Sequence, residues 1–255
     1  MHHIPRKRFS QNFLTDSQVI HNIVRAILPS KNNLLVEIGP GLGALTKPLL
    51  NSLNHLHVIE IDRDIVARLQ RENQENKLTT HLSDALKFDF FTLGKSLRIV
   101  GNLPYNISTP ILFHLSKFTK NIYDMHFMLQ KEVVERMVAL HSTSNYGRLS
   151  VMLQSRFEME LLFTIPPEAF HPTPKVQSAL VRMIPLKKPM VDAKKENLFA
   201  SIVAASFSQR RKTLRNTLQS YLKPKDFDIL QIEPKLRAEN LSVSQFVAIT
   251  NHLFK

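Results

Sequence analysis

Short apolar runs alternate with helical patterns over the first part of the chain. The runs that predict strands lie at 34–38, 57–61, 80–82, 98–100 and 124–129. Strands that are buried on both faces are apolar throughout, and strands that alternate with helices pair in parallel. The pattern therefore predicts an α/β protein whose mostly parallel sheet is covered by helices on both faces.

The pattern changes near residue 153. Residues 157–164 and 179–184 predict two strands with no helix between them, and a loop that contains prolines at 166, 167, 172 and 174 joins them. Proline cannot donate to a sheet and fixes its own backbone angle, so such a loop interrupts regular structure. We expect an antiparallel hairpin at the end of the parallel sheet.

Beyond Pro185 the sequence predicts helices only. Phe199, Val203 and Phe207 recur every four residues, and Ser242 with Gln245 forms a capping-box signature before an apolar helix. The polar, proline-bounded stretch 186–189 marks the expected boundary. We predict a catalytic domain at 1–186, which begins with a basic segment at 1–15, and a small all-helical domain at 187–255.

The composition adds a strong positive charge. The chain has 34 Lys and Arg against 21 Asp and Glu, a formal net charge of +13 at pH 7, which favours a nucleic acid partner. It has no cysteine, which excludes disulfides and thiolate zinc sites. The eleven histidines show no dense metal-ligand spacing, and no run approaches the roughly 18 apolar residues of a membrane span. We expect a soluble, cytoplasmic protein, monomeric and without a metal or a membrane partner.

A glycine-rich loop follows the first predicted strand. Gly39 and Gly41 in Gly39-Pro40-Gly41-Leu42-Gly43 let the backbone turn tightly and approach a ligand, at the strand end where open sheets bind nucleotides. Gly39, Gly41 and Ala44 also satisfy the dinucleotide pattern, with Glu60 about 20 residues further on. A nicotinamide oxidoreductase therefore remains an alternative at this point.

Three acids favour S-adenosylmethionine instead. Glu37 precedes the first glycine, where it would repel a pyrophosphate and attract a cationic amino-acid group. Glu60 ends the second predicted strand, where its carboxylate can accept hydrogen bonds from both ribose hydroxyls, and Asp84 follows the third, where it can accept one from the adenine amine. A helix cap or a solvated loop explains each acid alone, but the set of three predicts this cofactor.

The fourth strand leads into a segment whose residue types fit amine methylation, Asn102-Leu103-Pro104-Tyr105. The adenine amine is a poor nucleophile, and the Asn102 side-chain carbonyl and the Pro104 backbone carbonyl can hold its N–H groups. Proline biases Leu103 toward an extended conformation, and the Tyr105 ring offers a stacking surface. A plain type I turn explains the tetrapeptide equally well when it is taken alone. Phe170, in the proline-rich loop, is the expected second stacking ring, with a core position as the alternative.

These residues resemble the KsgA family (also called RsmA) of ribosomal RNA adenine dimethyltransferases. The resemblance covers nearly the whole chain, from Arg6 to Leu253, with motifs at 6–14, 37–46, 101–108, 131–137, 170–179, 207–216 and 237–241. It implies a Rossmann-like class I methyltransferase sheet of seven strands. It also implies contacts with S-adenosylmethionine from Asn12, Leu14, Gly39, Glu60, Asp84 and Asn102.

The resemblance further implies a substrate. It points to dimethylation of two adjacent adenosines near the 3′ end of small-subunit ribosomal RNA during late subunit maturation; loss of bacterial members gives kasugamycin resistance. Ser10 stands where many members carry glycine, a feature shared with the Erm resistance methylases of large-subunit RNA. Asn-Leu-Pro-Tyr and the segment 210–216 favour the KsgA type. An Erm-type enzyme, or an assembly factor with secondary methylation, are the alternatives.

Two clusters of cations are the expected RNA contacts. Each can neutralise phosphates, with the strong salt dependence that follows. A solvated helix face or a flexible tail is the alternative for either cluster. The residues are Arg6, Lys7 and Arg8 near the N-terminus, and Arg210, Arg211, Lys212 and Arg215 in the helical tail.

Overall fold

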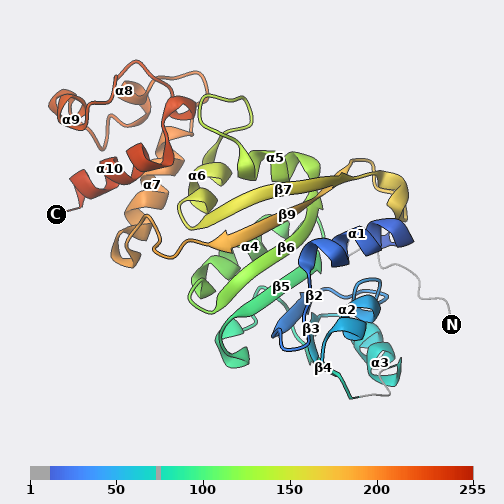
Figure 1. Ribbon diagram of the computed structural model, residues 1–255. Coiled ribbons are helices and arrows are strands. Elements are labelled where there is room, and N and C mark those ends of the chain that lie inside the picture. The colour runs from blue at the N-terminus through green and yellow to red at the C-terminus, as the bar shows by residue number, and fades with distance from the viewer. Residues whose placement is uncertain (1–11, 73–75, 255) are drawn as a thin grey trace. The chain divides into compact units, whose positions relative to one another are not determined.

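A seven-stranded sheet organises the first part of the chain (Figure 1). The structure, a computed structural model, describes residues 12–72 and 76–254. The strand order is β4-β3-β2-β5-β6-β9-β7. The parallel strands are β2 (Leu35–Ile38), β3 (Leu56–Glu60), β4 (Leu78–Leu82), β5 (Leu97–Asn102) and β6 (Ile122–Gln130).

The chain winds in opposite directions on the two sides of β2. It proceeds from β2 through β3 to β4 on one side, then crosses to β5 and β6 on the other. In open α/β sheets, this change of direction leaves a crevice outside the carboxyl ends of the central strands. The fold therefore places a ligand site beside the ends of β2 and β5, where the glycine-rich loop lies.

One strand near the edge of the sheet runs against the others. β9 (Ser178–Pro185) pairs antiparallel with β6, from Met125 opposite Met183 to Gln130 opposite Ser178, and β7 (Phe157–Ile165) forms the edge next to β9. The predicted mostly parallel sheet with a terminal antiparallel hairpin is confirmed.

Helices pack on both faces of this sheet. α1 (Ser17–Ile27) lies in front of it and α4 (Ser108–Leu115) behind it in Figure 1. One core joins apolar side chains of α1 with those of α2 (Thr46–Ser52), α3 (Arg63–Glu72) and the central strands. α5 (Lys131–Val138) follows β6. Every residue of β2 is buried, as expected for a strand covered on both sides.

Both ends of α1 are capped by side chains. The Asp16 carboxylate accepts a hydrogen bond from the Val19 backbone N–H at 2.9 Å. At the other end, the Arg98 guanidinium donates to the backbone carbonyls of Ile27 at 2.6 Å and Leu28 at 3.1 Å. Backbone N–H groups at the start of a helix and carbonyls at its end have no partner within the helix. The side chains that bond them therefore fix where α1 begins and ends.

Two very short strands were not predicted. β1 (Phe13–Leu14) pairs antiparallel with β8 (Phe170–His171), and the Thr15 N–H donates to the Ala169 carbonyl at 2.8 Å. Strands of two residues have no periodicity, so their sequence gives no signal. The pairing brings Leu14 next to the proline-rich loop.

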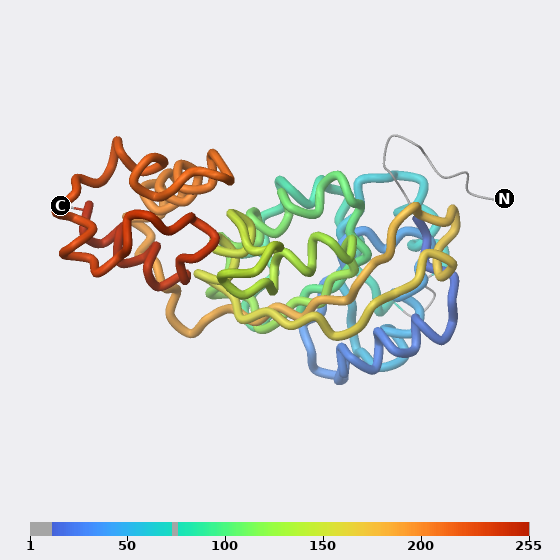
Figure 2. Tube along the Cα trace, turned by 90° about the horizontal axis from the view of Figure 1, so that it is seen from above, coloured from blue at the N-terminus to red at the C-terminus, as the bar shows by residue number. Residues whose placement is uncertain are grey.

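The rest of the described chain forms a second compact unit, which contains residues 135–159 and 186–254. Its helices are α6 (Arg148–Gln154), α7 (Glu196–Ser206), α8 (Leu214–Thr217), α9 (Pro224–Leu230) and α10 (Val243–Leu253). Within it α10 packs against α7 (Figure 2). The predicted capping box is confirmed: the Gln245 N–H donates to the Ser242 hydroxyl and the Ser242 N–H donates to the Gln245 side chain.

The unit boundary falls close to residue 186, but one segment differs from the predicted division. Residues 135–159 were expected in the first domain, whereas they group with the tail. The reason is their core: Tyr146 and Val151 are buried in one cluster with Phe199 and Ile202. That packing joins residues about 50 positions apart and leaves no local signature.

Candidate functional site

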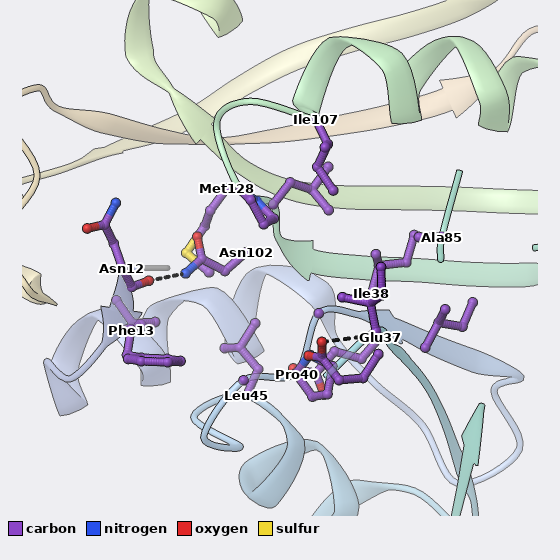
Figure 3. Close-up of a pocket in the computed structure, with 18 of the residues that line it drawn as sticks. Asn12, Phe13, Glu37, Ile38, Pro40, Leu45, Ala85, Asn102, Ile107 and Met128 are labelled. Atoms are coloured by element: carbon purple, nitrogen blue, oxygen red, sulfur yellow. Dashed lines mark hydrogen bonds between the residues drawn. The ribbon is translucent and has the colours of Figure 1, made fainter. Parts of the chain in front are cut away.

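A cavity of about 230 Å³ opens at the carboxyl ends of β2, β3, β5 and β6 (Figure 3). Its lining comes from residues 12–14, 37–42, 44–45, 59–61, 83–86, 102–107 and Met128. All residues predicted for the cofactor therefore line one cavity, together with Leu103, Pro104 and Tyr105. Within residues 12–72 and 76–254 there is no group of three or more His, Asp or Glu side chains that could hold a metal ion.

The glycine-rich loop forms one wall. Gly39 and Gly41 adopt φ angles of 67° and 55°, which residues with a side chain rarely adopt. A Cβ atom on Gly41 would also meet the Phe13 ring at 3.1 Å. The loop thus needs glycine here both for its turn and for the contact with β1.

Glu37 is a buried carboxyl group at the end of β2. Its side chain is 2% exposed, and its Oε2 accepts a hydrogen bond from the Thr46 hydroxyl at 2.7 Å. Burial raises the pKa of Glu37 to about 7; the Thr46 hydroxyl opposes this and the negative charge of Glu60 adds to it. A cation bound in the cavity would restore the ionised form, so this carboxyl is suited to a positively charged ligand.

Glu60 and Asp84 have their carboxylates fixed by the backbone. Glu60 Oε1 accepts from the N–H groups of Ile61 at 2.8 Å and Asp62 at 2.9 Å. Burial raises the pKa of Glu60, and these backbone amides oppose the rise. Asp84 Oδ1 accepts from the Leu86 N–H at 2.9 Å. The Gly41 backbone amide also acts on the Glu60 carboxylate and lowers its pKa. Both carboxylates are thus held in an orientation set before binding, and their remaining lone pairs can accept from a ligand.

Asn102 ends β5 with its side-chain amide held in one orientation. Its Nδ2 donates to the Asn12 backbone carbonyl at 2.9 Å (Figure 3). No residue in the described ranges donates to its Oδ1. The amide therefore offers its carbonyl oxygen as an acceptor on the wall of the cavity.

The residues after Asn102 form a tight turn. The Ile107 N–H donates to the Pro104 carbonyl at 3.1 Å, which uses one of the two lone pairs of that oxygen. The Tyr105 hydroxyl is 3.0 Å from the Ser178 hydroxyl on β9. Because Ser178 is buried, this hydrogen bond fixes the Tyr105 ring at the edge of the cavity.

Gly101 is required for a different reason. A Cβ atom at this position would lie 2.5 Å from the Ile38 backbone oxygen. That distance is far inside van der Waals contact, so β5 can approach the end of β2 only with glycine here. The close approach aligns Asn102 with the glycine-rich loop.

Phe170 lies in the core of the first unit and not on the wall of the cavity. Its ring is 2% exposed. The position differs from the accessible ring that stacking requires, because the β1–β8 pairing holds this residue inward. A stacking role for Phe170 stays a prediction that needs a local rearrangement of this segment.

The structure describes only one of the two predicted cation clusters. Arg6, Lys7 and Arg8 lie outside the described residues. Arg210, Arg211, Lys212 and Arg215 are all exposed, between the end of α7 and the single turn of α8. Exposure permits contact with RNA, and the contact itself stays a prediction.

Sequence reasoning missed two residues that organise the site. Thr46, the first residue of α2, hydrogen-bonds Glu37, and Ser178 holds Tyr105. Thr46 follows Glu37 by nine residues, so a polar residue at the start of the helix was the available signal. Ser178 is 73 residues from Tyr105, and nothing local pointed to it.

Comparison with known proteins places this site in a family. A family model described as ribosomal RNA adenine dimethylase matches residues 2–255. The chain belongs to this family. A protein of Nitrosospira multiformis called ribosomal RNA small subunit methyltransferase A is 68% identical over 252 residues, 99% of this chain and 97% of the relative. A protein of the same name from Thiobacillus denitrificans is 62% identical over 98% of each chain.

Solved structures agree on the fold of this dimethylase family member. A dimethyladenosine transferase from Plasmodium falciparum superposes with a TM-score of 0.81 at 24% identity, covering 93% of this chain and 95% of that one. The 23S rRNA methyltransferase ErmE gives 0.74 at 22% identity, covering 96% and 100%. The predicted class I methyltransferase fold is confirmed. None of the described helices is long and apolar enough to cross a membrane.

Proposed function

We propose that this chain transfers methyl groups from S-adenosylmethionine to the N6 amines of two adjacent adenosines near the 3′ end of small-subunit ribosomal RNA. We further propose that it acts as a cytoplasmic monomer on a pre-ribosomal particle, late in maturation. The orientation of Asn102 is the observation on which the chemistry depends, because its carbonyl oxygen is the acceptor that the amine needs.

The cavity supports this cofactor by its chemistry. When bound, S-adenosylmethionine supplies a methyl group on a positively charged sulfur. Glu37 would hold the cationic amino group, since its buried carboxyl has no cationic partner in the described part of the chain. Glu60 would accept from the ribose hydroxyls and Asp84 from the adenine amine. Asn12, Leu14, Gly39 and Gly41 would complete the contact surface.

The residues after β5 would orient the target amine. Asn102 Oδ1 and the remaining lone pair of the Pro104 carbonyl would each accept one N–H group. Tyr105, fixed through Ser178, would stack on the base, and Leu103 is buried behind this segment. None of the described residues that line the cavity is a strong base, so the rate would come from holding the nitrogen at the approach distance for transfer. The nitrogen gains a methyl carbon and releases a proton to solvent.

The relatives favour the small-subunit substrate over the large-subunit one. The relatives at 68% and 62% identity are named for the small subunit, whereas the likeness to ErmE, at 22%, extends to the fold alone. An assembly factor with secondary methylation would have the same cofactor site. Only a measurement of methyl transfer can therefore distinguish it from a dedicated methyltransferase.

The test is transfer of labelled methyl from S-adenosylmethionine to undermethylated small subunits and, separately, to large-subunit RNA. We expect dimethyladenosine in the small-subunit digest, lost in Asn102→Ala and retained in the exposed control Asn22→Ala. Label in large-subunit RNA alone would assign an Erm-type enzyme. No transfer to either, with the cofactor still bound, would leave the assembly factor.

A further inference from the structure

A second cavity, of about 600 Å³, lies at the opposite edge of the sheet. It is lined by the last residues of α1, by residues that precede β2 and β5, and by side chains of β6 and β9. The first cavity lies at the carboxyl ends of the parallel strands, whereas this one lies at their amino ends. Of the two cavities, α1 contributes only to the second, with its last residues Ala26 and Ile27 on the wall.

Arg98 and Asp124 form an ion pair on the wall of this cavity, and the hydrogen-bond donors of Arg98 all have partners. Arg98 donates from Nε and Nη2 to the two oxygens of Asp124, at 2.8 and 2.7 Å. Its remaining donors reach the Asn33 side chain and the carbonyls of Ile27 and Leu28. All five N–H groups of the guanidinium are used. Asp124 is the acid that lines the cavity, and its charge is balanced by this partner.

Two other polar side chains on the wall have a buried nitrogen atom without a hydrogen-bond partner in the described ranges. His126 on β6 is 3% exposed, and its Nδ1 has no hydrogen-bond partner in the described ranges, since Asp124 Oδ2 lies 4.0 Å from it, beyond hydrogen-bond distance. Arg182 lies directly opposite it on β9, and its Nε is also buried without a partner there. Side chains at directly paired positions start about 4.5–5.5 Å apart and lie on one face of the sheet.

Leaving such groups without partners costs free energy, more so when one is charged. Arg182 makes no ion pair or hydrogen bond to another described residue, so its positive charge has no counterpart on the wall. The exposed Lys95 adds a second positive charge to the lining. Burial lowers the pKa of His126 to about 4. The imidazole is therefore neutral near pH 7, and its Nδ1 can donate in one of the two tautomers.

We propose that this cavity binds a small oxyanion, the carboxylate or phosphate group of a small molecule, between Arg182 and His126. Both nitrogens are buried in the structure, so binding requires each side chain to turn toward the cavity. One oxygen then accepts from Arg182 Nε and another from His126 Nδ1, while Lys95 adds attraction from the exposed side. The planar guanidinium presents parallel donors that match two-oxygen groups. The site does not depend on the proposed methyl transfer, because it shares no lining residue with the first cavity.

The test follows the His126 ring directly by nuclear magnetic resonance. The full chain is labelled with ¹⁵N-histidine at pH 7, and His126 is assigned by its loss in His126→Asn. Inorganic phosphate or acetate is then added at constant ionic strength, with chloride as the balancing anion. Arg182→Gln removes the proposed partner, and Arg148→Gln removes a matched arginine that is exposed on α6.

We expect a saturable shift of His126 Nδ1 with at least one of the two anions. The dissociation constant should rise about 10-fold or more in Arg182→Gln, as expected for loss of a charge-assisted bond, and stay unchanged in Arg148→Gln. A response to phosphate alone or to acetate alone identifies the group that binds. The absence of a saturable shift with both anions, or equal affinity in Arg182→Gln, would overturn the proposal and leave a cavity filled by water.

Discussion

Replacing Glu37 with glutamine should change how the stability of the protein depends on pH. Burial raises the pKa of Glu37 from 4.5 to about 7 in the folded chain. Between these values the folded state binds more protons than the unfolded state, so the free energy of unfolding falls as the pH rises through this window. Each tenfold change in the ionisation constant corresponds to about 1.4 kcal/mol, so the whole window corresponds to about 3 kcal/mol.

Glutamine is neutral at every pH and can still accept from the Thr46 hydroxyl. We therefore expect Glu37→Gln to be more stable than the wild type at pH 8, by up to about 3 kcal/mol, with little difference at pH 4.5. The measurement is urea unfolding followed by circular dichroism at several pH values, with the two proteins compared at each. Glu158→Gln, which removes an exposed carboxylate on β7, is the control and should show no such trend.

The same substitution should weaken cofactor binding. A cationic amino group favours the ionised form of Glu37, so wild-type affinity for S-adenosylmethionine should rise by about 10-fold from pH 6 to pH 8, more steeply than that of Glu37→Gln. Calorimetry in buffers with different ionisation enthalpies would detect the released proton. A stability difference that does not vary with pH, or a wild type that is the more stable at pH 8, would refute the reasoning about this buried carboxyl.

Three further substitutions test the site. Asn102→Asp keeps an acceptor oxygen but loses the donor to the Asn12 carbonyl, so methyl transfer should fall about 100-fold while the chain stays folded, as a kcat measurement with circular dichroism would show. Ser178→Ala frees the Tyr105 hydroxyl and should lower kcat about 3- to 10-fold, the equivalent of one hydrogen bond, with cofactor affinity in calorimetry unchanged. Gly101→Ala forces a Cβ against the Ile38 oxygen and should cost about 3 kcal/mol or more in urea unfolding, whereas Gly147→Ala, with nothing within 4 Å, should cost much less.

The sequence alone determined the elements whose signal is local. Apolar runs marked the central strands of the main sheet, such as β2, because a strand buried on both faces has little room for polar residues. Gly39, Gly41, Glu60 and Asp84 could be placed at one edge of the sheet, because the carboxyl ends of parallel strands meet there. The Ser242 capping box could also be predicted, because its two partners are only three residues apart in the sequence.

The tertiary structure alone decided the contacts between distant residues. Asn102 is oriented by a carbonyl 90 residues away, Tyr105 by a hydroxyl 73 residues away, and Phe170 is turned inward by a pairing with β1. The second cavity depends in the same way on His126 and Arg182 meeting across β6 and β9. Such contacts follow from how whole elements pack, and a single interaction of this kind leaves no periodic pattern along the chain.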